Sequence, residues 1–210
     1  MKKVLISDVS LVLLFPKDRN YLGSLNQLYK DTKNKPNFDF FDYFEVNTQL
    51  LAIYKKHAAK LDYYIFTSDA IQDEPVLQPY WQDLFTGIYS AAKMGVHKSE
   101  LRAYTTLIAE IGAQPKDVLY IDDSQSNISA ATSCGINAFV YQSNAQVEEL
   151  LESQTSLIWV SFNKKSLDIK VHLTLCLQKS KRRVSFKHMQ ENQVFTEELT
   201  NQNVRPAQQK

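Results

Sequence analysis

Short apolar segments alternate with segments of helical spacing between residues 3 and 153, and this alternation limits the fold more than any other feature of the chain. The expected strands cover residues 3–7, 62–69, 87–90, 117–124 and 137–141, and the expected helices cover residues 45–61, 98–112, 126–135 and 144–153. Strands that alternate with helices form a parallel sheet covered by helices. The sequence therefore predicts an α/β protein with a Rossmann-like parallel sheet.

The composition is typical of one domain of ordinary size with an appendage. A formal net charge of +1 over 210 residues argues against a polyanion-binding role, so nucleic-acid binding is not expected. The first apolar run is too short to span a bilayer, and it is not expected to be a signal peptide because Asp8 interrupts it and no small-residue cleavage site follows. Two cysteines, Cys134 and Cys176, are too few for a disulfide framework, so we expect a cytoplasmic protein.

Three of the expected strands end in clustered polar side chains. They are Asp8 and Ser10 just past the first strand, Thr67, Ser68 and Asp69 at the end of the second, and Asp122, Asp123 and Ser124 at the end of the fourth. The carboxyl ends of parallel strands lie at one edge of a sheet, where such folds bind ligands. Three carboxylates at one edge raise one another's pKa, and a hard divalent cation such as Mg²⁺ relieves their repulsion. We therefore predict a shared polar site that binds Mg²⁺.

The residue types at this edge suit the transfer of a phosphoryl group. Asp8 can attack phosphorus, Lys98 and the cation can neutralise the phosphoryl oxygens, and Thr67 can donate a hydrogen bond to one of them. Ser68 either begins the next helix or touches the substrate, whereas Asp69 is expected to be the N-cap of that helix.

Four segments, in this order, resemble the motifs of the haloacid dehalogenase-like hydrolases, most of which are Mg²⁺-dependent phosphatases. They are VLISDVSLVLL, IFTS, KMGVHKSELRAY and VLYIDDSQSNISAATSCGINAFVY. The resemblance spans residues 3–142 and implies a nucleophile at Asp8, the hydroxyl at Thr67 and the lysine at Lys98. It also implies that Asp122 and Asp123 lie at the metal.

One departure from the family pattern affects the chemistry. The family's first motif is usually Asp-x-Asp, in which the second Asp is the general acid and base, and Ser10 stands in that place. A serine hydroxyl has no pKa near neutrality and shuttles protons poorly, although the backbone carbonyl of Ser10 can still bind the metal. The first hypothesis is a Mg²⁺-dependent phosphatase that forms an aspartyl-phosphate at Asp8. The alternative is a non-catalytic relative that binds a partner. A dehalogenase is disfavoured because a metal cluster is of no use to that reaction.

A short cap is expected where the family inserts one, at about residues 17–45, within a core of residues 1–153. A small helical cap leaves the site open, which favours a large or varied substrate or a partner protein that covers the site. The expected substrate is a small-molecule phosphate ester or a phosphorylated macromolecule.

The C-terminal part lies outside the resemblance. Strict alternation of aliphatic residues from 167 to 177 predicts a β-strand extension over residues 154–188, and residues 189–210 are expected to be disordered. The apolar face of these strands is expected to pack on the core or to bind a second copy or a protein partner.

Overall fold

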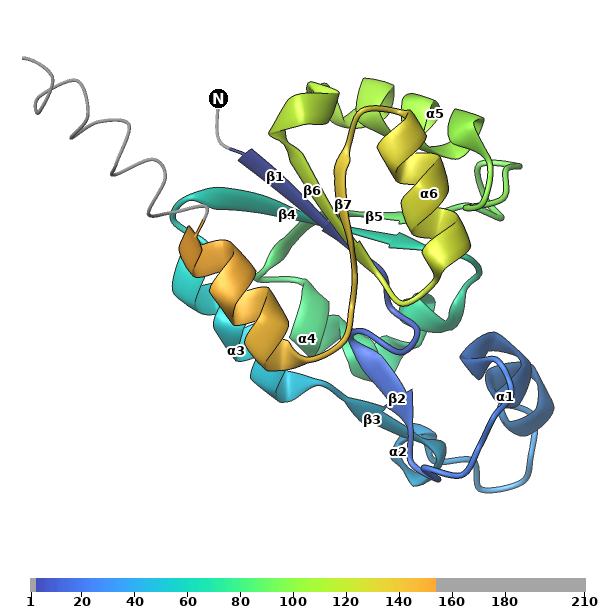
Figure 1. Ribbon diagram of the computed structural model, residues 1–210. Coiled ribbons are helices and arrows are strands. Elements are labelled where there is room, and N and C mark those ends of the chain that lie inside the picture. Colours follow the sequence, from blue (N-terminus) through green and yellow to red (C-terminus); the bar gives the residue numbers. More distant parts are fainter. Residues whose placement is uncertain (1–2, 154–210) are drawn as a thin grey trace, which may run out of the picture. The chain divides into compact units, whose positions relative to one another are not determined.

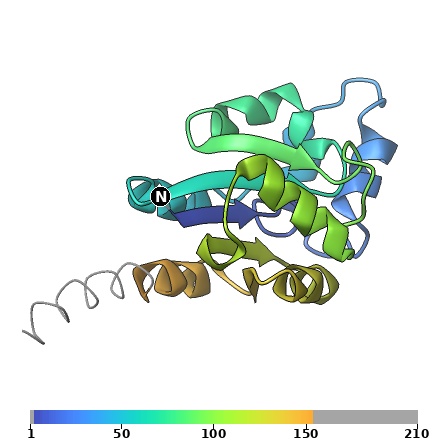
Figure 2. The ribbon, with the colours of Figure 1, turned by 90° about the horizontal axis from the view of Figure 1, so that it is seen from above.

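The computed structural model describes residues 3–153 and contains a five-stranded parallel sheet of order β5-β4-β1-β6-β7 (Figure 1). The strands are β1 (Lys3–Ser7), β4 (Leu61–Thr67), β5 (Phe85–Ser90), β6 (Val118–Asp122) and β7 (Asn137–Val140). Figure 2 shows the strands side by side in this order. The predicted α/β fold is confirmed.

Helices cover both faces of the sheet because residues along each buried strand alternate between two cores. Val4 and Ile6 of β1 belong to the core that includes α5 (Leu101–Ile111) and α6 (Gln125–Ser133). Leu5 belongs to the other core, with α3 (Thr48–His57) and the helix of residues 144–153. This period of two is the pattern expected of a β-strand buried on both sides.

Helix α5 ends where the sequence predicts. Gly112 has a φ of +71° and its N–H donates to the carbonyls of Ile108 and Ala109, which satisfies orphan groups at the helix end. Leu101, the first residue of the helix, is 49 % exposed.

The segment expected to form the cap lies between two strands that sequence periodicity does not predict. Strands β2 (Leu14–Pro16) and β3 (Phe44–Val46) form a short antiparallel ribbon, and the chain between them carries α1 (Leu25–Thr32) and α2 (Phe40–Tyr43). Three-residue strands are too short to show alternation.

Helix α1 is tied to the segment that follows β4. Lys30 forms an ion pair with Asp69, and the Tyr29 hydroxyl donates to Glu74. That segment contains the short 3-10 helices η1 (Ile71–Asp73) and η2 (Pro75–Leu77) and the single turn α4 (Gln78–Trp81); η3 (Pro115–Asp117) precedes β6. The expectation that Asp69 is an N-cap is wrong: η1 has Ala70 at its N-cap and no side-chain capping bond, and Asp69 faces α1 instead.

The remaining expectations concern membrane-spanning segments and the C-terminal part of the chain. Within residues 3–153, no helix is long and apolar enough to cross a membrane. The expected β-extension of residues 154–188 and the expected tail of residues 189–210 lie outside the described residues.

Candidate active site

Three neighbouring strands deliver the predicted site residues to one edge of the sheet. Strand β1 lies between β4 and β6, so Asp8 directly after β1 stands between Thr67 and Asp122, the last residues of its two neighbours. The backbone N–H of Asp8 still donates to the carbonyl of Ile121 on β6, 2.8 Å away, which fixes its position relative to that strand.

Carboxylate oxygens converge at this edge as the sequence predicts. One oxygen each from Asp8, Asp122 and Asp123 lie within 4.8 Å of one another. Asp8 and Asp122 are buried, while Asp123 is partly exposed and gives the cluster a route to solvent.

Lys98 joins two of these carboxylates. Its Nζ lies 2.7 Å from Oδ1 of Asp8 and 2.6 Å from Oδ2 of Asp122, and its side chain is 2 % exposed. The ring centroids of Phe66 and Tyr120 lie 5.5 and 5.7 Å from the same Nζ, so two aromatic rings flank the ammonium group.

Asp122 is held by donors on both of its oxygens. The backbone N–H of Ser124 donates to Oδ1 at 2.8 Å, Asn127 Nδ2 donates to Oδ1 and Oδ2 at 3.0 and 3.1 Å, and the Tyr120 hydroxyl donates to Oδ2. Asn127 therefore braces Asp122. Tyr120 is a contributor that sequence reasoning missed. The sequence could have indicated this role, because residues 120 and 122 are two positions apart on one strand and therefore share a face of the sheet.

Burial and neighbouring charges shift the pKa values of Asp8, Asp123 and Lys98. Burial, with the charge of Asp122 added, raises the pKa of Asp8 to about 7 against the opposing effect of Lys98. Burial and Asp122 also raise the pKa of Asp123. For Lys98, burial lowers the pKa, but the two carboxylates outweigh burial and the net direction is upward.

The residues at this edge fit Mg²⁺. Three carboxylates against one ammonium group leave excess negative charge, and oxygen ligands are those that Mg²⁺ prefers. Within the described residues, buried Thr67 Oγ1 also has no hydrogen-bond partner, as expected of a group that contacts a ligand. Asp8, Asp122 and Asp123 would hold the ion together with the backbone carbonyl of Ser10, which remains a prediction.

Ser10 and Ser68 lie at the same edge but are less enclosed. Ser10 is partly exposed two residues after Asp8, and Ser68 is exposed directly after Thr67. A role for Ser68 in substrate binding remains a prediction.

Replacing Lys98 by methionine is expected to lower the free energy of unfolding by about 3 kcal/mol in Mg²⁺-free buffer. The change leaves the Asp8 and Asp122 carboxylates buried without the ammonium group between them. Because Asp8 can take up a proton, the expected loss of stability is near the lower end of the range for a broken buried ion pair. Urea unfolding with and without Mg²⁺ measures it, and Mg²⁺ should recover part of the loss. Lys93→Met is the matched control, because Lys93 forms an exposed ion pair with Asp73. Equal losses in the two variants would contradict the bridging role of Lys98.

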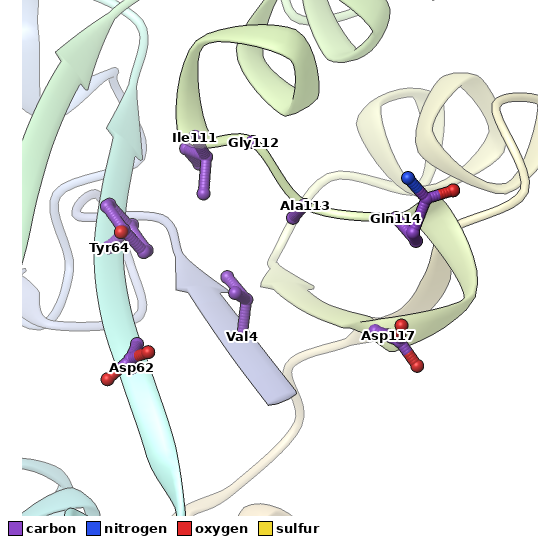
Figure 3. A pocket seen from close by; sticks show the side chains of 8 residues that line it. All are labelled: Val4, Asp62, Tyr64, Ile111, Gly112, Ala113, Gln114 and Asp117. Carbon is purple, nitrogen blue, oxygen red and sulfur yellow. The ribbon is translucent and has the colours of Figure 1, made fainter. Parts of the chain in front are cut away.

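A second hollow lies at the opposite edge of the sheet (Figure 3). It measures about 190 Å³ and is lined by residues near the amino ends of β1 and β4 and the end of α5, among them Val4, Asp62 and Gln114. No predicted site residue lines it, so the polar carboxyl edge is the candidate reaction site.

Comparisons with known proteins agree with this fold. The family described as haloacid dehalogenase-like hydrolase matches residues 22–141, a segment that contains Thr67, Lys98 and the Asp122–Asp123 pair and begins after Asp8. Among solved structures, a HAD family enzyme of Bacteroides thetaiotaomicron, crystallised with magnesium and inorganic phosphate, has 18% identity and a TM-score of 0.52, over 68% of this chain and 95% of that one.

A HAD-superfamily hydrolase of Geobacter sulfurreducens has 12% identity and a TM-score of 0.50, over 67% of this chain and 90% of that one. These identities show a common fold only. The family match, in contrast, covers more than half of the 210 residues. On that match, the chain belongs to the haloacid dehalogenase-like hydrolases.

Proposed function

We propose that the protein is a Mg²⁺-dependent phosphatase that acts on a phosphate ester through an aspartyl-phosphate at Asp8. The observation that carries this proposal is that three buried groups meet at one sheet edge: the Asp8 carboxylate, the Lys98 ammonium group 2.7 Å from it, and the Thr67 hydroxyl, which has no hydrogen-bond partner among the described residues. They are a nucleophile, a cation and a hydroxyl donor, the three groups that phosphoryl transfer requires.

Asp8, Lys98 and Thr67 each have one role in the proposed reaction. An oxygen of Asp8 attacks phosphorus, and the bond from phosphorus to the leaving oxygen breaks with its electron pair on that oxygen. Lys98 and Thr67 hold phosphoryl oxygens during the transfer. Bound Mg²⁺ supplies further neutralisation of phosphoryl charge. Water then attacks phosphorus, which releases inorganic phosphate, gives up a proton to solvent and restores Asp8.

Ser10 limits which esters this site can process. Its hydroxyl cannot protonate a poor leaving group or activate water near neutral pH. We therefore expect faster turnover of esters whose leaving groups depart as stable anions, such as aryl phosphates. The substrate is a small-molecule phosphate ester or a phosphorylated macromolecule. Support for a phosphate ligand comes from the similarly folded Bacteroides enzyme, whose structure holds magnesium and inorganic phosphate.

Magnesium is expected to stabilise the protein, because a ligand that binds only the folded state raises its stability by about 2.7 kcal/mol at one hundred times its Kd. For a chain of this size that corresponds to a rise in Tm of about 5–10 °C. A thermal titration with MgCl₂ measures the rise, and Asp123→Asn should abolish most of it. No rise with either Mg²⁺ or Mn²⁺ would contradict the metal site.

A panel of aryl and alkyl phosphates, assayed with and without Mg²⁺, tests the enzymatic function. Turnover that depends on Mg²⁺ supports the phosphatase. The second candidate, a non-catalytic binding protein, is favoured by the Ser10 replacement, and it would be supported if Mg²⁺ binds but no ester is turned over.

A further inference from the structure

We propose that Tyr120 is a positioning residue for the reaction proposed above, because it orients Asp122 with its hydroxyl and flanks the Lys98 ammonium with its ring. The inference rests on the proposed function. It concerns a residue that touches neither the substrate nor the reacting atoms and that acts through Asp122 and Lys98.

The contacts of Tyr120 place both of its functional parts on the site. Tyr120 is fully buried on β6, two residues before Asp122 and on the same face of that strand. Its hydroxyl donates to Oδ2 of Asp122, the same oxygen that lies 2.6 Å from Nζ of Lys98. Its ring centroid lies 5.7 Å from that Nζ. One side chain therefore contacts both members of the ion pair.

Tyr104 contacts Tyr120 but neither Asp122 nor Lys98 through a hydrogen bond or ion pair found among the described residues. The Tyr104 hydroxyl donates to the Tyr120 hydroxyl at 3.4 Å, and the two rings meet at an interplanar angle of 67° with centroids 5.2 Å apart. The direction of donation follows from the contact with Asp122 itself, because a carboxylate oxygen accepts and the Tyr120 hydroxyl must therefore donate to it, with or without Tyr104. A tyrosine hydroxyl is protonated near neutral pH, so it is available as a donor.

Loss of this donor should change how Asp122 and Lys98 are held. Without it, Oδ2 of Asp122 keeps only Lys98 and Asn127, so the carboxylate can turn and can draw Lys98 away from Asp8. Hydrogen-bond partners of groups at a metal site typically contribute about 10–100-fold in metal affinity or activity. This is the range in which we expect the effect of the Tyr120 hydroxyl.

Tyr120→Phe and Tyr104→Phe form a matched pair for the test. Each removes one buried hydroxyl and keeps the ring, but only the first removes a donor to a carboxylate. The readouts are the MgCl₂ concentration that gives half of the thermal stabilisation, and kcat and KM for p-nitrophenyl phosphate. Tyr120→Phe should raise that concentration or lower kcat about tenfold or more, with KM for the ester within about twofold. Tyr104→Phe should leave all three within about twofold of wild type.

A double variant tests whether Tyr120 acts through Asp122. If it does, adding Tyr120→Phe to Asp122→Asn should change the Mg²⁺ midpoint by less than about twofold, because the group it orients is already altered. Equal effects of the two Tyr→Phe variants, a loss of Tm alone, or full additivity with Asp122→Asn would each overturn the proposal. If the wild type binds Mg²⁺ but hydrolyses no ester, the proposed function fails, and the Mg²⁺ midpoints still decide the role of Tyr120.

Discussion

Replacing Asp8 by asparagine is expected to reduce phosphatase activity to background while the protein stays folded. The amide is nearly isosteric, but it cannot attack phosphorus or supply negative charge to the metal. Removal of the nucleophile in a hydrolase costs on the order of 10⁶ in kcat. The fold should tolerate the change. Burial raises the pKa of Asp8 to about 7, so the site already accommodates the neutral form of this side chain near neutral pH.

Steady-state kinetics on an aryl phosphate with saturating MgCl₂, together with a thermal unfolding curve, measures both parts of this prediction. Asp117→Asn is a suitable control, since Asp117 lines the hollow at the opposite edge of the sheet. It should retain wild-type activity. Activity of Asp8→Asn close to wild type, with Mg²⁺ still required, would remove Asp8 from the nucleophile role.

Replacing Ser10 by aspartate is expected to raise turnover of alkyl phosphates by up to about 10²–10⁴, the usual contribution of a positioned acid or base. An alkyl leaving group needs a proton, and the aspartyl-phosphate needs an activated water for its hydrolysis. The gain in the first step should be smaller for aryl phosphates, whose leaving groups depart without a proton. The new carboxylate must fit beside Asp8 and the metal, so a gain below the full range is expected.

Ser10→Asn is the matched control, because it has nearly the same shape as aspartate without a proton to transfer, and it should give no gain. The measurement is kcat for one alkyl and one aryl ester with all three proteins. If Ser10→Asp brings no gain on either ester while Mg²⁺ still binds, the site lacks more than one catalytic group. The binding-protein hypothesis should then replace the phosphatase.

The sheet and the main site residues could be predicted from the sequence because local signals specify them. Strand β1 is a short apolar run, and parallel strands place their carboxyl ends together, so Asp8, Thr67 and Asp122 meet without any knowledge of distances. Gly112 likewise marks the end of α5 through a backbone conformation that glycine adopts at little cost.

Features that depend on contacts between distant segments could not be predicted in this way. The β2–β3 ribbon pairs residues that flank the cap and has too few residues for a periodic pattern. Aspartate is a residue type that is common at helix N-caps, but the Asp69 carboxylate instead pairs with Lys30 of α1, which lies 39 positions away in the sequence. The bridge made by Lys98 between Asp8 and Asp122 also joins three separate segments, and motif order indicated only that Lys98 was nearby.

The central claim is that Asp8 receives the phosphoryl group, and rapid-quench kinetics with p-nitrophenyl phosphate and MgCl₂ tests it most directly. Because Ser10 activates water poorly, the aspartyl-phosphate should accumulate and give a burst of p-nitrophenolate before the steady state. Borohydride reduction of the quenched protein, followed by mass spectrometry of its peptides, should then locate the modified residue at Asp8. Linear product release with no modification at Asp8, or a modification at another residue, would contradict the account.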